Sequence, residues 1–173
     1  MALIVEDGTL VSGAESLCSV DFADTYLADR GYTLWAGLTT TQKEQAHRRA
    51  ADYIEQAYGP RWEGYKASAS QALSWPRQDV PMKDAGGQHI AAYFPANVVP
   101  AIVQQAQAAM AFKAASGDLS PDLTRAVQSE TIGPLSTTYA NGSPQFTRYR
   151  VIDNMLAPLL RESGGASFRI VRG

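Results

Sequence analysis

The chain has 173 residues, of which 45% are hydrophobic and 18% charged, with a formal net charge of −2 and a single cysteine. This length suits one domain, or one domain with an arm, and the apolar content excludes wholesale disorder. The slightly acidic balance excludes a strongly basic nucleic-acid coat, and one cysteine excludes both an intrachain disulfide and a four-cysteine zinc site.

Residues 1–18 show no clear periodicity and are expected to form an extended N-terminal arm or a short strand around Ala2 to Val5. Ser19 suits the cap of a helix that begins at Val20, because its hydroxyl can accept a hydrogen bond from a free backbone N–H of the first turn. Gly31 is the predicted end of this helix. The start of the chain has no signal-peptide pattern, and no apolar run approaches the ~20 residues of a membrane span. We therefore expect a soluble, intracellular protein without a membrane partner.

Two further helices are predicted in the first two thirds of the chain. Thr41 and Glu44 fit a capping box, in which the hydroxyl and the carboxylate each satisfy a backbone donor. Apolar residues then recur at intervals of three and four until residues 59–60, which are Gly-Pro and end the helix. A third helix is predicted over residues 100–117. Because it is rich in alanine, which lets helices approach closely, we expect it to be the central helix of a bundle.

The segments outside these helices have distinct compositions. Residues 61–95 are rich in aromatic residues, glycine and proline, which predicts a long loop that is functional, packed by its own aromatic side chains, or both. Strand-forming residues after residue 117 predict one β-hairpin over about 126–140. A last helix is predicted at about 151–160, where Pro158 is expected to kink or shorten it.

These elements predict a mainly α fold, a small helical bundle with one β-hairpin and extended N- and C-terminal arms. We expect an N-terminal arm at 1–18, a helical bundle at 19–117 that contains the long aromatic loop 61–95, a hairpin and C-terminal helix at 118–162, and a C-terminal tail at 163–173. The tail begins with small, flexible residues, and its partial alternation suits the addition of a strand to a neighbour's sheet.

Residues for catalysis or ligand binding form no recognisable constellation. His47 is expected on the polar side of the second helix and His89 in the long loop, and neither has a metal-ligand partner at helical spacing. Cys18 precedes a helix N-terminus, but a buried or inert thiol is the favoured interpretation. The glycines form no phosphate-binding pattern. We predict a protein that is not an enzyme and that uses no cofactor and no metal.

The aromatic residues of the long loop allow two interpretations. Trp62, Trp75 and Arg77 are either anchors that pack the loop onto the helices or a stacking platform for single-stranded nucleic acid. Residues 43–77 contain six basic and four acidic residues, which is a weak positive excess. The anchor interpretation is therefore favoured, and Trp75-Pro76 is expected to lock a reversal of the chain.

Charge is distributed unevenly between the two ends. Residues 1–30 contain six acidic residues and one arginine, whereas residues 144–173 contain five arginines and two acidic residues. Ends of opposite charge are able to steer head-to-tail contact between copies. The alternative is that both are solvated surfaces without a partner.

Short motifs distributed along the chain carry a resemblance to a known family. They are, in chain order, Val5-Glu6-Asp7-Gly8-Thr9, Gly13-Ala14-Glu15-Ser16, Arg30-Gly31 with Trp35, Arg49-Ala50-Ala51-Asp52-Tyr53-Ile54, Arg61-Trp62, Gln71-Ala72-Leu73, Trp75-Pro76-Arg77, Pro100-Ala101-Ile102, Ile132-Gly133-Pro134 and Ala157-Pro158-Leu159-Leu160. In this combination the chain resembles a tailed-phage family often labelled DnaT-like single-stranded DNA-binding protein. Members of that family resemble head–tail adaptor proteins, also called connector or head-completion proteins. The likeness spans about residues 5–160.

The resemblance implies a structural virion protein at the head–tail interface, present in the host cytoplasm during assembly. It implies a homo-oligomeric, dodecameric ring that binds the portal protein, extends the DNA ejection channel and joins a tail-side connector or tail protein. Double-stranded DNA would pass without tight binding, because strong phosphate contacts would hinder it. The family label implies the alternative, a single-stranded DNA-binding accessory of replication or packaging.

The tail lies outside the part of the chain that carries the resemblance, so its role is inferred from physical arguments alone. Its mixture of apolar and basic side chains suits a segment that becomes ordered when it binds a partner. The candidate contacts with the portal or another partner are Phe168, Arg169, Ile170, Val171 and Arg172.

Overall fold

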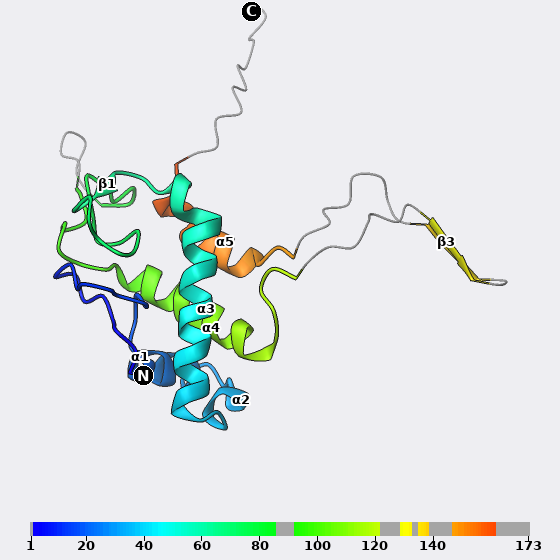
Figure 1. Ribbon diagram of the computed structural model, residues 1–173. Helices are drawn as coiled ribbons and strands as arrows, with labels where there is room; N and C mark the ends of the chain where they lie inside the picture. The colour runs from blue at the N-terminus through cyan, green and yellow to red at the C-terminus, as the bar shows by residue number, and fades with distance from the viewer. Residues whose placement is uncertain (1, 86–91, 122–128, 133–134, 139–146, 162–173) are drawn as a thin grey trace, which may run out of the picture.

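The computed structural model describes residues 2–85, 92–121, 129–132, 135–138 and 147–161, and its fold is mainly α (Figure 1). The body contains helices α1 (Val20–Ala28), α2 (Thr33–Ala36), α3 (Thr40–Tyr58), α4 (Ala101–Ser116) and α5 (Arg150–Leu156), with 3-10 turns η1 (Gly59–Arg61) and η2 (Ala157–Leu159). The predicted fold class is confirmed.

Two short antiparallel pairs of strands accompany the helices. β3 (Ser129–Ile132) pairs with β4 (Leu135–Thr138) within the predicted hairpin. β1 (Tyr65–Lys66) pairs with β2 (Arg77–Gln78), a pairing that the sequence did not indicate. This pairing joins two parts of residues 61–95, the segment that was predicted to be one long loop.

The ends of the helices follow from local chemistry, with one correction. Ser19 caps α1 as predicted, because its hydroxyl accepts the Phe22 N–H at 3.1 Å. The capping box predicted at Thr41 is wrong by two residues. Thr39 is the cap of α3: its hydroxyl accepts the Gln42 N–H at 3.3 Å, and the Gln42 amide oxygen accepts the Thr39 N–H at 2.9 Å.

Helix α4 is the centre of the body, as its composition predicted. It contacts α1, α3 and α5, and its most extensive contact is with α3. Alanines from both helices are completely buried in this core, which small side chains allow because they let the backbones come close. They are Ala46 and Ala50 of α3 with Ala106, Ala108, Ala111 and Ala114 of α4.

The segment that precedes α1 is irregular, as expected, but it is folded onto the body. Val5 and Ser16 form a parallel bridge, and the Glu6 carboxylate is 1% exposed. This carboxylate accepts the backbone N–H groups of Gly8, Leu10 and Val11 at 2.8, 3.0 and 3.0 Å, which fixes a tight loop. The expectation that residues 1–18 lack regular helices and long strands is therefore confirmed. The expectation that they extend away from the body as an arm is wrong.

Gly8 is required by the way this loop meets the rest of the chain. Its φ is +105°, and a Cβ at this position would lie 2.1 Å from the Asn97 carbonyl oxygen. Only a residue without a side chain permits this close approach of two backbones.

The position of the α3 cap can be tested by comparing two threonines. Thr39→Ala removes the capping hydroxyl and should lower the free energy of unfolding by about 1 kcal/mol. Thr41→Ala changes an exposed residue inside the first turn and should have almost no effect, or a slightly favourable one, because alanine is the better helix former. Urea denaturation followed by circular dichroism measures both. Equal losses in the two variants would contradict the assigned cap.

Candidate functional site

The three residues singled out in the long loop lie in the core. The Trp62 and Trp75 side chains are 1% and 0% exposed, and their rings meet edge to face at 5.6 Å. The Arg77 guanidinium donates to the carbonyl oxygens of Glu63, Gly64 and Ser74 at 2.8, 2.9 and 3.2 Å. These contacts tie parts of the segment to one another, and the burial of both indoles places it in the core of the body. Because the two indoles are enclosed, neither offers a face on which a base could stack.

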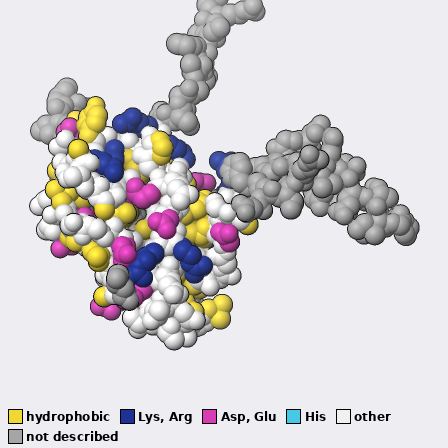
Figure 2. Space-filling view, viewed as in Figure 1, with side chains coloured by type: hydrophobic (Ala, Val, Ile, Leu, Met, Phe, Trp, Pro, Cys, Tyr) yellow, Lys and Arg dark blue, Asp and Glu magenta, His cyan; other side chains and the backbone are white. Residues whose placement is uncertain are grey.

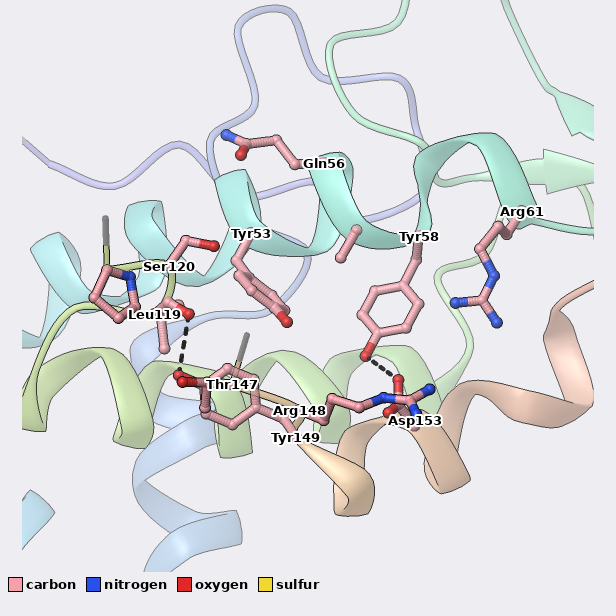
Figure 3. Close-up of a pocket in the computed structure, with 12 residues that line it drawn as sticks. Tyr53, Gln56, Tyr58, Arg61, Leu119, Ser120, Thr147, Arg148, Tyr149 and Asp153 are labelled. Carbon is pink, nitrogen blue, oxygen red and sulfur yellow. Dashed lines mark hydrogen bonds between the residues drawn. The ribbon is translucent and has the colours of Figure 1, made fainter. Parts of the chain in front are cut away.

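Three tyrosines from elsewhere in the chain, two of them partly exposed, line a different cavity. It has a volume of about 540 Å³ and lies between the end of α3, residues 119–121 and the segment that enters α5 (Figure 3). We call it the tyrosine pocket. Its lining residues are Tyr53, Gln56, Ala57, Tyr58, Arg61, Leu119, Ser120, Pro121, Thr147, Arg148, Tyr149 and Asp153.

The rings of the tyrosine pocket are held by one another and by hydrogen bonds. Tyr53 and Tyr149 meet edge to face at 5.4 Å, and both are partly exposed. The Tyr149 hydroxyl donates to the Leu119 carbonyl oxygen at 3.2 Å. The Tyr58 hydroxyl donates to the Asp153 carboxylate at 2.8 Å. The pocket is therefore preorganised, and the hydrogen bond between Tyr58 and Asp153 joins residues 95 positions apart in the sequence.

Charges at the tyrosine pocket have both signs. The Arg61 guanidinium lies 5.8 Å from the centre of the Tyr58 ring, and the exposed Arg148 also lines the pocket, with its guanidinium beside the Asp153 carboxylate in Figure 3. Burial, and then the hydrogen bond to Asp153, raises the pKa of the Tyr58 hydroxyl far above its usual value, so it remains a neutral donor. Aromatic rings with guanidinium groups at the rim suit a planar or anionic ligand.

Sequence reasoning did not identify this pocket. In the sequence analysis Tyr53 appeared only within a motif of the family resemblance, and Arg148 was only one of the five arginines of residues 144–173. Two partial signals were present, the spacing of Tyr53, Tyr58 and Arg61 and the Arg148-Tyr149-Arg150 run. Neither shows that the end of α3 meets the start of α5.

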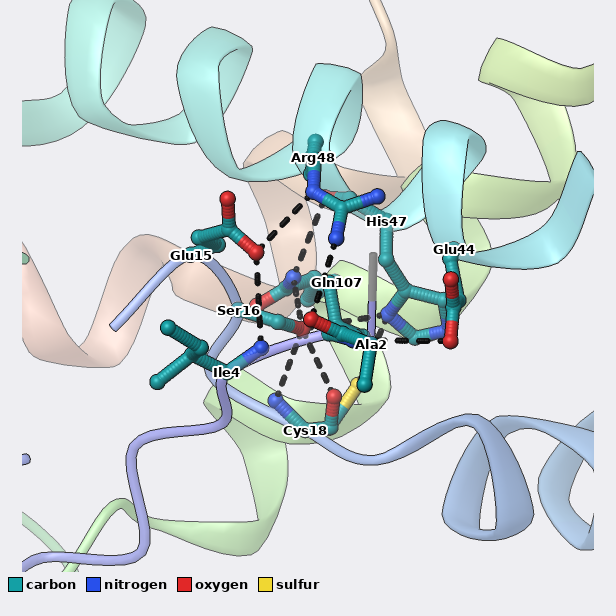
Figure 4. A network of polar contacts seen from close by, with 10 residues as sticks. Ala2, Ile4, Glu15, Ser16, Cys18, Glu44, His47, Arg48 and Gln107 are labelled. Atoms are coloured by element: carbon teal, nitrogen blue, oxygen red, sulfur yellow. Dashed lines mark hydrogen bonds and ion pairs between the residues drawn. The ribbon is translucent and has the colours of Figure 1, made fainter. Parts of the chain in front are cut away.

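A second cluster of polar residues is completely enclosed (Figure 4). His47 and Gln107 are both 0% exposed, as is Ser16. Gln107 accepts the Leu17 N–H at 2.6 Å and donates to the Ser16 hydroxyl at 2.7 Å, and that hydroxyl donates to the Cys18 carbonyl oxygen at 2.6 Å. The network joins the segment before α1 to both α3 and α4.

The prediction that His47 lies on the polar side of its helix is wrong. Its ring packs edge to face against Trp35 at 5.9 Å, because α2 and the segment before α1 cover this part of α3. His47 Nδ1 lies 3.2 Å from the Ser16 hydroxyl oxygen and 3.8 Å from the Cys18 sulfur. Since the Ser16 proton is already donated, Nδ1 must carry the hydrogen of this contact.

Burial determines the ionisation of the network. It lowers the pKa of His47 to about 4, an effect that the negative charge of Asp24 partly opposes. Burial also raises the pKa of Cys18 to about 12. At neutral pH the imidazole and the thiol are therefore both uncharged and enclosed, which suits a structural role and agrees with the expectation of an inert cysteine.

The statements that follow on metal sites and membrane spans apply only to the described part of the chain. Within it, no three His, Cys, Asp or Glu residues come close enough to hold a metal ion. The described helices are too short or too polar to cross a membrane. His89 and the tail residues Phe168, Arg169, Ile170, Val171 and Arg172 lie outside the described residues.

Comparison with known proteins gave one match. A family model described as "Putative DnaT-like ssDNA binding protein" matches residues 1–173. Neither the search of curated proteins nor the search of solved structures gave a match.

The enclosed imidazole predicts a loss of stability in mild acid. The pKa of His47 is lower in the folded protein than its unfolded value of about 6.5, so the unfolded chain binds the proton first as the pH falls. Between pH 7 and pH 5 this effect should cost about 2 kcal/mol of the free energy of unfolding.

The control is His47→Gln, which keeps a hydrogen-bonding side chain and removes the titrating group. Urea denaturation at several pH values should give a flatter pH dependence for this variant, even if it is less stable at pH 7. The same dependence in both proteins would show that His47 does not cause the loss.

Proposed function

We propose that this chain, which belongs to the family described as "Putative DnaT-like ssDNA binding protein", works as a structural adaptor. In this proposal it does not bind DNA tightly. In this proposal it is a virion protein of a tailed phage, a head–tail connector. Copies of the chain form a ring below the portal protein, extend the DNA channel and join the tail.

The observation that carries this proposal is the β3–β4 hairpin. Within the described residues β3 pairs with β4 alone, so each strand has an outer edge with unused backbone donors and acceptors. An isolated two-stranded hairpin is only marginally stable in water, and such edges readily pair with another chain. A hairpin whose two outer edges have no partner strand within the described residues is suited to contact a neighbouring copy.

The body has the rigidity that a ring subunit requires. Its core combines the α3–α4 interface with the buried Trp62 and Trp75, and the enclosed network around Gln107 fixes the segment before α1. Repetition of one heterologous contact around an axis closes such subunits into a ring.

The distribution of surface charge favours a channel through which DNA passes over a protein that binds DNA tightly. On the described residues of the face in Figure 2, basic and acidic side chains are interspersed, and the whole chain has a net charge of −2. A protein that holds DNA through many phosphates needs a concentrated basic surface, whereas a channel through which DNA passes does not.

The hairpin proposal can be tested by replacing residues 129–138 with a Gly-Ser sequence of equal length. This change removes the strand-forming side chains and keeps the length of the connection, so the helical body should retain its circular dichroism spectrum. Mass photometry with purified portal protein should show a complex of portal with several copies of the wild-type chain. The variant with residues 129–138 replaced should not form a complex of portal with several copies of the chain.

A matched control uses Tyr65→Ala, which changes an exposed tyrosine of β1 in the body. This variant should assemble like wild type. Assembly of the replaced chain with portal at wild-type stoichiometry would contradict the role of the hairpin, and failure of the wild-type chain to bind portal at all would overturn the adaptor proposal.

A second candidate function, binding of single-stranded DNA, is favoured by one observation in addition to the family description. The tyrosine pocket combines the partly exposed rings of Tyr53 and Tyr149 with the guanidinium groups of Arg61 and Arg148. Bases stack on aromatic rings, and guanidinium groups pair with phosphates. If this function is correct, these residues replace Trp62 and Trp75 as the stacking platform.

This candidate predicts a specific loss of affinity. Tyr53→Ala should weaken the binding of a fluorescent oligodeoxythymidine about 5- to 150-fold at low salt, because base stacking on one ring is worth about 1–3 kcal/mol. Fluorescence anisotropy measures the binding. Tyr65→Ala again provides the control, since Tyr65 is exposed and lies outside the pocket. Equal losses in the two variants, or no binding by wild type, would exclude a specific DNA site at this pocket.

A further inference from the structure

A second cavity lies near the point where the described chain ends. It has a volume of about 410 Å³ and lies between residues 81–85, Phe94, the first turn of α4 and η2. We call it the η2 groove. Most of its wall is apolar and comes from Pro81, Phe94, Pro100, Ile102, Pro158 and Leu159.

The chain leaves the fold at the edge of the η2 groove. Leu159 is part of the groove wall, and its carbonyl oxygen accepts the Glu63 N–H at 2.9 Å. Two residues later the Arg161 N–H donates to the Arg61 carbonyl oxygen at 2.7 Å. These bonds fix the last described residues beside the groove, so whatever follows Arg161 starts next to it.

The length of chain that follows is sufficient to fill the groove. Residues 162–173 reach about 40 Å when extended, at about 3.3 Å per residue. Gly164 and Gly165 permit a reversal of direction. Phe168 and Ile170 are two positions apart, so an extended backbone carries both on one face.

Charge at the rim of the groove also fits this segment. The rim contains the exposed Asp84 and also Lys83, whose ammonium group lies 4.0 Å from the Glu63 carboxylate. The basic residue between Phe168 and Ile170 is Arg169, which can pair with Asp84 while its apolar neighbours enter the groove.

We propose that the η2 groove is the docking site of the chain's own C-terminal segment, with Phe168 and Ile170 as the apolar anchors and Asp84 as the partner of Arg169. The same chain is the occupant because the linker of residues 162–167 is short. Tethering by a short linker gives an effective concentration in the millimolar range, far above that of a second copy at micromolar protein. This inference does not depend on the proposed function.

The proposal can be tested in the full chain by disulfide trapping. Ala101→Cys places a thiol on an exposed residue of the groove wall, and Ile170→Cys places one in the segment. A disulfide forms only when the two Cα atoms come within about 7 Å. The native Cys18 is buried and contributes little background. Copper phenanthroline is the oxidant, and the protein is kept dilute.

The control pair combines Ile170→Cys with Thr41→Cys. Thr41 is exposed on the first turn of α3, at the opposite end of the body from η2 (Figure 1). Non-reducing gels and intact mass should show an intramolecular disulfide in the Ala101 pair that forms at least about tenfold faster than in the control pair. Addition of Phe168→Ser, which removes an anchor from the segment and leaves the body unchanged, should reduce the rate to that of the control.

Equal rates in the two pairs would overturn the proposal, because they would indicate a segment that samples the surface without docking. A disulfide that forms chiefly between two chains would also overturn it and would assign the groove to the segment of a second copy. An unchanged rate after Phe168→Ser would remove Phe168 as an anchor and contradict the proposed mode of docking.

Discussion

The close contact between α3 and α4 is the interaction on which the rest of the structure depends. Completely buried alanines on both helices, such as Ala50 and Ala106, let the two backbones approach. This pair places α1 and α5, because both pack against α4 and α1 also contacts α3. A larger side chain at such a position would force the helices apart, since a closely packed core has no room for it.

Polar groups, as well as apolar ones, hold the peripheral segments to this core. Gln107 lies at the centre of α4, and its amide joins Leu17 and Ser16 to the body. Glu6 fixes the loop that precedes them with three backbone hydrogen bonds. Buried polar groups are costly unless they are paired, so these networks accept few alternative arrangements of the segment before α1.

The candidate sites lie where this core ends. The tyrosine pocket lies at the end of α3 and the start of α5, and the η2 groove lies at the start of α4. The β3–β4 hairpin occurs between α4 and α5 in the sequence. The proposed DNA-binding function uses Tyr53 and Tyr149 of the tyrosine pocket, whereas the proposed adaptor function uses the hairpin, so the two proposals concern different parts of one molecule.

The sequence by itself determined the helical class, the cap at Ser19, the central alanine-rich helix and the hairpin, because capping, helical periodicity and strand propensity act between residues close in the chain. It placed the α3 cap two residues too late, since Thr39 and Thr41 offer the same chemistry and only the start of the helix distinguishes them. The tertiary structure alone decided that His47 is enclosed and that Glu6 holds a folded loop. It also decided that Tyr58 meets Asp153 across 95 residues of chain. These facts depend on which surfaces the helices turn toward each other, and no local pattern specifies that choice.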